Sequence, residues 1–539
     1  MEELTRLEEQ RLALQERCDR NKTQEERNRL GQFATPPDLA LGILALAKTL
    51  LPTGEQVRFL DPAFGTGSFF SALLRTFGPE CIRAAEGFET DPHYGEPARD
   101  VWRTSKLKLH IADFTRAEPP KSTERFNLVV CNPPYVRHHY LKAEEKARLR
   151  HMSQANSGVR LGGLAGLYCY FILLADAWMA ENGIALWLVP SEFMDVNYGV
   201  SLKRYLLSKV TLLRIHRFHP EDVQFGDALV SSSVVCFRKT LPQTAHSVEF
   251  TFGGTLAHSR VSRIVPLYAL QAESKWNGHP APGAQEKAAR VTLSDFFTVK
   301  RGLATGNNRF FILTREQIKQ HQLPMKFFRP ILPSPRYLSS DEINADEDGY
   351  PMLKQQVFLL DCRVPEKELR EKYPALWRYL ESGKSDAARR YLCRSRSPWY
   401  SQEDRPAALF VCTYMGRGNA RGRRPFRFIL NRSRATAANV YLLLYPKPLL
   451  AQELEAKPDL ARTIWNLLNG LSPQMVSDQG RVYGGGLQKL EPKELGNVPA
   501  DEIARLLCLP TERTGVQLDL LSPRGAATSP WLRTKRQYF

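Results

Sequence analysis

The chain has 539 residues, of which 43% are hydrophobic and 10% aromatic, so it is long enough for two or three domains with substantial cores. It contains no run of about 18 uninterrupted apolar residues, as a membrane-spanning helix requires, and its first thirty residues are charged throughout, unlike a secretory signal. The nine cysteines are scattered, without a CxxC pair or a His/Cys metal spacing. These features argue against a membrane protein and a disulfide scaffold, and they predict a cytoplasmic protein without a structural metal.

The whole chain has a formal net charge of +18, and this positive charge is concentrated in its second half. Residues 1–240 hold 31 Lys and Arg against 29 Asp and Glu, about +2, whereas residues 241–539 hold 44 against 28, about +16. This asymmetry indicates a chemistry module joined to a module that binds a polyanion such as nucleic acid. A basic surface that only aids solubility is the alternative.

The first half alternates between short apolar strands and helices. Residues 1–28 predict a solvated, charged helix that packs on the domain after it, rather than a coiled coil, and the apolar run at 39–50 has the length of a helix. Strands are predicted at 57–60, 87–88, 107–111, 126–131, 184–190, 212–218 and 231–237. Helical stretches such as 69–77 and 167–180 separate several of them, whereas 136–165 is interpreted as a long polar loop. The order predicts a doubly wound, mainly parallel α/β sheet, whose ligands bind at the carboxyl ends of its strands.

A turn of small residues follows the first of these strands. Gly65 and Gly67 let the backbone turn sharply and approach a ligand closely. The spacing lacks the third glycine of a pyrophosphate-binding loop, and Asp61, just before the turn, would repel phosphate. The same carboxylate suits an ammonium group. S-adenosylmethionine carries such a group and no phosphate, so it is the cofactor that the turn favours.

Further acids lie at the ends of the next two strands. Glu89 lies 28 residues after Asp61, where a carboxylate can accept hydrogen bonds from both ribose hydroxyls. Asp113 and Phe114 follow the third strand and would place an acceptor near an adenine amine and a ring against the base. Each acid alone is more often a capping or solvated loop residue. Three acids at three consecutive strand ends indicate a cofactor site instead.

The fourth strand ends in the tetrapeptide Asn132-Pro133-Pro134-Tyr135. The exocyclic amine of adenine is a poor nucleophile because its lone pair is delocalised into the ring. The side-chain oxygen of Asn132 and the main-chain carbonyl of Pro133 can accept its two hydrogens and localise that lone pair, while the prolines stiffen the turn. Tyr135 offers a face for a planar base, and such stacking contributes about 1–3 kcal/mol per base. The tetrapeptide therefore predicts methyl transfer to a conjugated amine or amide.

Together these motifs resemble the gamma-class N6-adenine DNA methyltransferases of bacterial restriction–modification systems. The resemblance rests on GQFATPP at 31–37, DPAFGTG at 61–67 and the tetrapeptide at 132–135, in that order, and it covers roughly residues 30–240. It implies a Rossmann-like class I methyltransferase domain that uses S-adenosylmethionine. It further implies a target adenine rotated out of double-stranded DNA, a C-terminal target-recognition domain, action as a monomer and a cognate restriction endonuclease as a partner.

The resemblance also implies roles for individual residues. Thr35 and Asp61 would contact the methionine part of the cofactor. The full set of expected cofactor-binding residues is Thr35, Asp61, Ala63, Gly65, Gly67, Glu89, Asp113, Phe114 and Asn132. Phe225 matches an aromatic residue that packs against the flipped base in this family, although phenylalanine before a strand is usually a core residue. The expected catalytic residues are Asn132, Pro133, Pro134, Tyr135 and Phe225.

An arginine-rich segment, residues 389–434, contains twelve arginines, no lysine and two acids. Aromatic residues are interleaved with these arginines. Arginine forks suit phosphates and guanine edges alike, so the segment predicts contact with DNA, with a solvated basic surface as the alternative. The arginines expected to bind DNA are Arg394, Arg396, Arg417, Arg421, Arg423, Arg424 and Arg427.

Four parts are predicted along the chain. They are a charged helix (1–30), the methyltransferase domain (31–240), a linker region rich in Pro, Gly, Ala and Ser (241–290), and a mixed α/β target-recognition domain (291–539). The predicted function is site-specific methylation of adenine N6 in double-stranded DNA.

Three other functions fit parts of the pattern. A protein glutamine methyltransferase can share the tetrapeptide but lacks a basic C-terminal domain of nearly 300 residues. An RNA adenine methyltransferase differs only in its acceptor. An inactive DNA-binding defence subunit is disfavoured by the intact Asp61, Asn132 and Tyr135.

Overall fold

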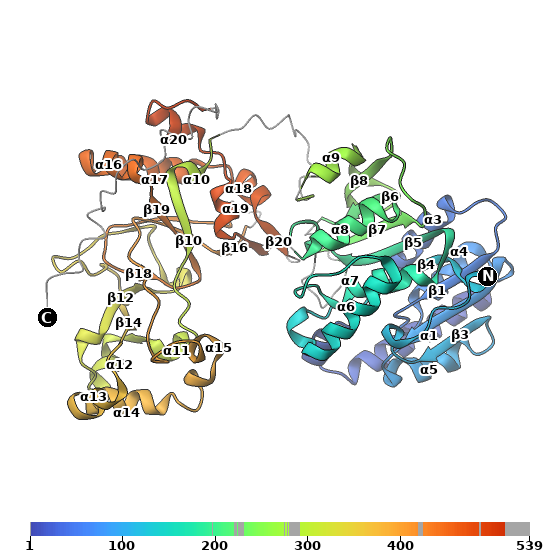
Figure 1. Ribbon diagram of the computed structural model, residues 1–539, viewed down its shortest axis with the longest axis horizontal. Helices are drawn as coiled ribbons and strands as arrows, with labels where there is room; N and C mark the ends of the chain where they lie inside the picture. The colour runs from blue at the N-terminus through green and yellow to red at the C-terminus, as the bar shows by residue number, and fades with distance from the viewer. Residues whose placement is uncertain are drawn as a thin grey trace. The chain divides into compact units, whose positions relative to one another are not determined.

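The computed structural model describes residues 2–511, except 197, 220–221, 223, 225–230, 274, 277–278, 280–290, 419–423 and 484–486. The chain divides into two compact units, one of residues 1–284 and one that comprises most of residues 285–539 (Figure 1). Within the described residues, no helix is both long enough and apolar enough to span a membrane.

The first unit is built on a nine-stranded sheet with the order β3-β2-β1-β4-β5-β7-β6-β8-β9. Strands β1 to β5 run parallel, and β7 is antiparallel to both β5 and β6. The predicted doubly wound fold is confirmed, and the chain order reverses between β1 and β4, which is where such sheets bind ligands. The strands are β1 (Val57–Asp61), β2 (Ile82–Glu89), β3 (Leu107–Ile111), β4 (Phe126–Cys131), β5 (Met179–Pro190), β6 (Thr211–Arg217), β7 (Ser232–Arg238), β8 (Ser247–Gly254) and β9 (Ser259–Pro266).

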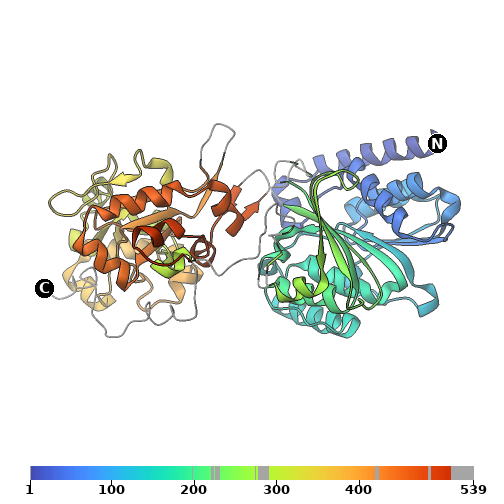
Figure 2. The same cartoon turned by 90° about the horizontal axis from the view of Figure 1, so that it is seen from above.

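Helices cover both faces of this sheet (Figure 2). Alternate side chains of each central strand enter different cores, because successive residues of a strand point to opposite faces. On β1, for example, Phe59 packs with α1, α3, α4 and α5, whereas Leu60 packs with α6, α7 and α8. The helices are α1 (Glu2–Arg20), α2 (Gln24–Leu30), α3 (Pro37–Leu50), α4 (Ser68–Phe77), α5 (Pro92–Trp102), α6 (Ala143–Ser157), α7 (Leu167–Ala175), α8 (Gly199–Ser208) and α9 (Leu267–Ala272).

Three parts of the first unit differ from the sequence-based expectation. The single helix expected over 1–28 is two helices, α1 and α2, because Thr23 and Glu26 form a capping box that starts a new helix. The expected polar loop at 136–165 contains helix α6, which buries Leu149 and ends at Gly158 in the left-handed conformation. Its residues are good helix formers, but few of them are apolar, so no helical spacing of apolar residues was visible in the sequence. The expected linker over 241–290 is replaced in large part by the β8–β9 hairpin, whose apolar residues extend the sheet core beyond residue 240.

The second unit contains a five-stranded, a four-stranded and a three-stranded sheet with short helices around them, as expected for a mixed α/β domain. Its strands are β10 (Phe297–Arg301), β11 (Ile312–Thr314), β12 (Phe328–Leu332), β13 (Glu342–Ile343), β14 (Val357–Leu360), β15 (Phe410–Thr413), β16 (Met415–Arg417), β17 (Phe428–Asn431), β18 (Thr436–Ala437), β19 (Tyr441–Pro446), β20 (Arg481–Tyr483) and β21 (Leu487–Lys489). Its helices are α10 (Leu293–Phe296), α11 (Asn308–Phe311), α12 (Arg315–Gln320), α13 (Glu366–Lys372), α14 (Pro374–Ser382), α15 (Tyr391–Arg394), α16 (Pro448–Ala456), α17 (Leu460–Gly470), α18 (Pro473–Gln479), α19 (Pro492–Gly496) and α20 (Asp501–Leu506).

Candidate active site

The loop after β1 begins with a buried carboxylate. Asp61 is 1% exposed, and its Oδ1 accepts a hydrogen bond from the Ala63 amide at 3.1 Å. Burial, together with the nearby charge of Glu89, raises the pKa of Asp61 to about 8. Gly67 starts α4 at φ 95°, and a Cβ there would lie 2.6 Å from Nε1 of Trp102. The turn therefore requires glycine at this position.

Glu89, at the end of β2, connects two loops of the site. Its Oε2 accepts from the Gly65 amide at 2.9 Å, and its Oε1 accepts from the Asp91 amide at 2.8 Å. Burial raises the pKa of Glu89 although these two bonds oppose the shift. Each carboxylate oxygen can accept a second hydrogen bond, so the group can still hold a hydroxyl of a ligand.

Asp113 and Phe114, after β3, have defined local roles. The Oδ1 of Asp113 accepts from the amide and the hydroxyl of Thr115 at 2.9 and 2.8 Å, which caps a short 3₁₀ turn. Phe114 is 3% exposed, with its ring centroid 5.4 Å from that of Phe88 and 5.2 Å from that of Trp178. Both residues lie at the expected strand end, and their contact with a cofactor stays a prediction.

The side chain of Asn132 is fixed in one orientation. Its Nδ2 donates to the Phe33 carbonyl at 2.9 Å and to the Thr35 hydroxyl at 3.1 Å. Since a carbonyl can only accept, the amide must turn its NH₂ group to Phe33. Its Oδ1 is buried and has no partner among the described residues. Pro133 is buried and Pro134 half-buried. The structure therefore contains an oriented, unused acceptor at the end of β4.

Tyr135 is tied to two other segments. Its hydroxyl donates to the Leu188 carbonyl in β5 at 3.0 Å, and its amide donates to the Gly31 carbonyl at 3.2 Å. A Cβ on Gly31, at φ 67°, would lie 2.3 Å from the Tyr135 nitrogen. Burial raises the pKa of Tyr135 far above its usual value, so the side chain stays a neutral phenol. The 31–35 segment and the tetrapeptide thus form one unit.

Helix α1 holds the glycine turn from outside the sheet. Arg11 is 1% exposed and makes two hydrogen bonds of 2.7 Å to the Glu8 carboxylate. The same guanidinium donates to the hydroxyls of Thr66 and Ser68 at 3.2 and 3.0 Å. The Thr66 hydroxyl donates to Oε1 of Gln15 at 2.7 Å. The packing of this helix on the domain was predicted from the sequence. The buried Arg11 was not, because the irregular apolar spacing of the helix does not mark a buried face.

The carboxylates of Asp61 and Glu89 and the side-chain oxygen of Asn132 form a set of acceptors that fits S-adenosylmethionine. The buried Asp61 carboxylate has no cation within ion-pair distance among the described residues, and an ammonium group would compensate its charge. Glu89 ends β2 and Asn132 follows β4, and these two strands flank β1 on either side. Acidic groups and an unpaired acceptor therefore gather at the edge where the sheet reverses its order.

Two family models match the chain. The model described as Eco57I restriction-modification methylase matches residues 89–224, which include the tetrapeptide. The model described as Type II methyltransferase M.Eco57I, C-terminal domain, matches residues 283–512, most of the second unit. Both models describe restriction–modification methylases of the Eco57I type, so the chain resembles such a methylase in each of its two units. The family predicted from the motifs is confirmed at this level, and S-adenosylmethionine is the cofactor that such methylases use.

Related proteins agree with this assignment. The chain is 27% identical over 492 residues to Type II methyltransferase M.AccI of Acinetobacter calcoaceticus, covering 87% of this chain and 85% of that protein. It is 28% identical over 478 residues to Type II methyltransferase M.XamI of Xanthomonas campestris pv. amaranthicola, covering 87% and 84%. Among solved structures, the Type IIL restriction-modification enzyme MmeI in complex with DNA is similar at a TM-score of 0.50 and 14% identity, covering 78% of this chain and 60% of that one. This last likeness concerns the fold alone.

Some expected site residues of this methylase lie outside the described residues. They are Phe225, Arg421 and Arg423. Their roles stay predictions.

Two of the expected DNA-binding arginines hold the second unit together. The Arg427 guanidinium pairs with Asp341 at 2.6 Å and also donates to the carbonyls of Pro335 and Leu338. The Arg396 guanidinium donates to the carbonyls of Ala304 and Thr305. Arginines that satisfy protein carbonyls have few donors left for a phosphate.

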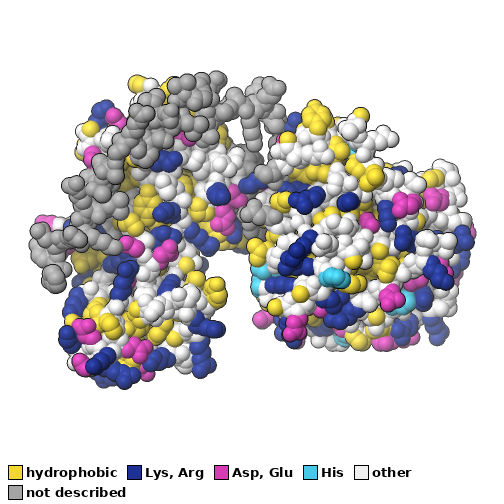
Figure 3. Space-filling model, viewed as in Figure 1, with side chains coloured by type: hydrophobic (Ala, Val, Ile, Leu, Met, Phe, Trp, Pro, Cys, Tyr) yellow, Lys and Arg dark blue, Asp and Glu magenta, His cyan; other side chains and the backbone are white. Residues whose placement is uncertain are grey.

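Three other expected DNA-binding arginines are exposed, namely Arg394, Arg417 and Arg424. The interleaved aromatic residues are mostly in the cores, but Tyr391 is 84% exposed at the start of α15. The Arg390 guanidinium beside it pairs with Asp386 at 3.2 Å. In Figure 3, Lys and Arg side chains are numerous on the part of the second unit where Figure 1 places α12 to α15.

Cofactor affinity is expected to increase with pH below about 8. Without cofactor, Asp61 stays protonated up to its pKa of about 8, which is above the ordinary 3.8. The folded state therefore binds one more proton than the unfolded state between these two pH values, and the free energy of unfolding decreases as pH rises between them. An ammonium group beside Asp61 favours the carboxylate, so binding releases a proton. The Kd for S-adenosylmethionine should then fall by up to about tenfold per pH unit between roughly pH 6 and 8.

Calorimetry in buffers of different ionisation enthalpy measures this proton release directly. The variant Asp61→Asn should bind weakly and without this pH dependence. A wild-type Kd that stays constant from about pH 6 to 8 would contradict the assignment of Asp61 to the cofactor's ammonium group.

Proposed function

We propose that this methylase transfers a methyl group to the N6 amine of a specific adenine in double-stranded DNA. The observation that carries the proposal is the fixed amide of Asn132, whose Oδ1 is buried without a partner among the described residues. An unsatisfied buried acceptor costs about 1–3 kcal/mol. A ligand N–H that occupies it in the complex removes that cost, and the exocyclic amine of adenine provides one.

The chain's groups activate the amine by accepting its hydrogens. Asn132 Oδ1 takes one hydrogen bond and the Pro133 carbonyl the other, so the nitrogen becomes tetrahedral and its lone pair is free to attack. The cofactor would supply the methyl group from its sulfonium sulfur: as the N–C bond forms, the C–S bond breaks and the sulfur leaves as a neutral thioether. The neutral phenol of Tyr135 is not a base, and the surplus proton leaves to solvent after methyl transfer. Positioning provides most of the acceleration.

Access to the amine requires that the adenine leave the duplex, at a cost of a few kcal/mol. Stacking on Tyr135, and on Phe225, would offset part of this cost. We infer that the second unit binds the duplex, since it belongs to the half of the chain with the +16 charge. Its exposed arginines at positions 394, 417 and 424 are the candidates for this contact.

The test is to map N6-methyladenine by single-molecule sequencing of DNA from cells that express the chain. The expected result is methylation at one short sequence, absent in cells that express Asn132→Ala. Purified protein with tritiated cofactor then compares duplex DNA, RNA and protein as acceptors. Label in RNA or protein but not in DNA would replace the proposal by one of the alternative methyltransferases, and no label in any of them would support an inactive subunit.

Removal of the exposed ring at α15 is expected to weaken DNA binding. Tyr391 is 84% exposed beside arginines, so its ring can stack on a base or sugar, and Tyr391→Ala should raise the Kd for target DNA about 5- to 100-fold. Arg394→Gln should lower the slope of log Kd against log salt by about one. The control variant is Tyr337→Ala, because Tyr337 is also an exposed tyrosine of the second unit. Tyr400 is unsuitable as a control because its ring is buried. An unchanged Kd in Tyr391→Ala would exclude this contact.

A further inference from the structure

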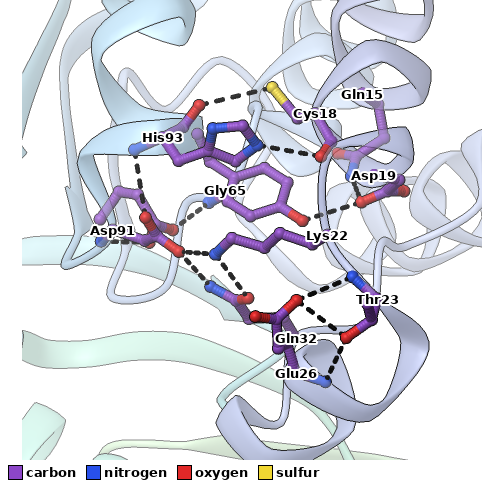
Figure 4. A network of polar contacts seen from close by, with 12 residues as sticks. Gln15, Cys18, Asp19, Lys22, Thr23, Glu26, Gln32, Gly65, Asp91 and His93 are labelled. Atoms are coloured by element: carbon purple, nitrogen blue, oxygen red, sulfur yellow. Dashed lines mark hydrogen bonds and ion pairs between the residues drawn. The ribbon is translucent and has the colours of Figure 1, made fainter.

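A cluster of three polar side chains lies beside the site (Figure 4). Asp91 is two residues beyond Glu89, in the loop between β2 and α5. Its Oδ2 accepts from Nζ of Lys22 and from Nε2 of Gln32, the latter at 2.8 Å. Lys22 Nζ also donates to Oε1 of Gln32 at 3.2 Å. Lys22, Gln32 and Asp91 thus bond to one another in a closed ring, here called the Lys22–Gln32–Asp91 cluster.

The cluster is bonded directly to the cofactor side of the site. The Asp91 amide donates to Oε1 of Glu89 at 2.8 Å, while the Gly65 amide donates to Oε2 of the same carboxylate at 2.9 Å. A change in the position of Glu89 when it accepts a ribose hydroxyl therefore acts on Asp91 through one hydrogen bond.

The cluster is bonded equally directly to the catalytic side. Gln32 is the residue between Gly31 and Phe33, whose carbonyls accept from the Tyr135 amide and from Nδ2 of Asn132 at 3.2 and 2.9 Å. The Gln32 side chain connects this short segment to Asp91. Its displacement would move the acceptors that orient the Asn132 amide.

The Lys22–Gln32–Asp91 cluster is partly buried and is held by neighbouring contacts. The side chains of Lys22 and Asp91 are only 17% and 18% exposed. Burial would raise the pKa of Asp91, but the hydrogen bonds from Lys22 and Gln32 outweigh it and lower that pKa below its usual value. On the far side, the His93 ring bonds to the Cys18 carbonyl at 2.9 Å, which fixes the first turn of α5 to α1. The cluster is therefore held in place by contacts on both of its sides.

We propose that Gln32 and Asp91 are positioning residues that couple occupation of the cofactor site to the orientation of the Asn132 amide. The coupling rests on the proposed function, because it acts on the acceptor that holds the target amine. Binding of cofactor at Glu89 and of the flipped base at Asn132 then reinforce each other. By linkage the reinforcement is the same in both directions, and a factor of about 5 to 20 is expected.

The experiment measures the Kd of a duplex that contains the mapped target sequence, with and without saturating S-adenosylhomocysteine. For the wild type, the ligand should tighten DNA binding about 5- to 20-fold. In Gln32→Ala this ratio should fall to near one, and kcat should fall about tenfold, while the Kd for cofactor changes less than about threefold. Glu89 keeps both its backbone donors in this variant, which is why cofactor binding persists.

Two further measurements and three control variants separate the proposed coupling from a merely structural role of Gln32. Cofactor-binding stoichiometry and thermal melting report the folded fraction, by which kcat is corrected. Lys22→Arg should retain the ratio, whereas Lys22→Met should lose most of it. Arg20→Gln breaks an exposed ion pair with Glu16 on the same helix and should leave every value unchanged.

The possible results either support the coupling or contradict it. In the double variant Gln32→Ala/Asn132→Ala, the ratio should be no lower than in Asn132→Ala alone, since both changes interrupt one path. A wild-type ratio and kcat in folded Gln32→Ala overturn the coupling but leave the methyltransferase assignment intact. If the wild type transfers no methyl group to DNA, the proposed function itself fails, and the coupling with it.

Discussion

Asn132→Ala is expected to lower kcat for DNA methylation by at least about 100- to 1000-fold, with cofactor affinity changed less than about threefold. The magnitude is that of removing one preorganised hydrogen-bonding group from a transition state. The alanine leaves the amine's lone pair delocalised, because only the Pro133 carbonyl remains as an acceptor. Cofactor affinity persists because Asp61 and Glu89 lie on other strands. Single-turnover methylation with tritiated cofactor measures the loss.

The chain offers a matched control for this variant on the same strand. Asn127 lies five residues earlier, near the other end of β4. Its Nδ2 donates to Oε1 of Glu55 and to the Gln56 carbonyl at 2.7 and 3.0 Å, and its Oδ1 accepts from the Arg58 amide at 2.8 Å. Asn127→Ala should keep kcat within about twofold. Thr35→Val removes one of the two acceptors that orient the Asn132 amide, so it should cost about tenfold or less. Normal turnover by Asn132→Ala would refute the mechanism.

Arg11→Ala is expected to destabilise the first unit by about 3–5 kcal/mol, because it leaves the Glu8 carboxylate in a buried place without its partner. It also removes the donors to the hydroxyls of Thr66 and Ser68. For a unit of this size such a loss lowers Tm by roughly 6–20 °C. The Kd for cofactor should rise as well, since the glycine turn loses its outer support. Calorimetry and cofactor titration measure the two effects.

The pH dependence of stability distinguishes the contribution of the Glu8–Arg11 ion pair from that of the packing of the Arg11 side chain. Burial alone would raise the pKa of Glu8, but its bonds to Arg11 and Ser71 lower it below 4.5. The pair therefore stabilises the fold above about pH 4.5 and loses that effect as pH falls through the lowered pKa. The double variant Glu8→Gln/Arg11→Met should be closer to wild type than Arg11→Ala. A Tm within about 2 °C of wild type in Arg11→Ala would disprove the support role.

The sequence was most informative about the parallel strands. The predicted ranges 107–111 and 126–131 coincide with β3 and β4. Strands like β4, buried on both faces, are continuous apolar runs bounded by turn residues, so their limits are visible. The strand-end residues Asp61, Glu89 and Asn132 follow from the same limits. The positions of these polar groups were thus predictable without any knowledge of packing.

Other features depend on contacts that no local pattern encodes. Arg396 and Arg427 look like their exposed neighbours in the sequence, yet both bind carbonyls of residues far along the chain. The hairpin β8–β9 pairs with β6 across the sheet edge, so its membership in the first unit is a matter of strand pairing. Helix α1 carries a buried Arg11 whose partners Thr66 and Ser68 lie more than fifty residues away.

The bond between Phe33 and Asn132 spans 99 residues, and this has a consequence for the order of events during synthesis. At roughly 5–20 residues per second, Phe33 leaves the peptidyl-transferase centre about 5–20 s before Asn132 does. Throughout that interval, the segment that will orient the Asn132 side chain has no Asn132 amide to bind. The Leu188 carbonyl that anchors Tyr135 is made later still. A nascent chain is thus unable to assemble its active site before most of the central sheet has been translated.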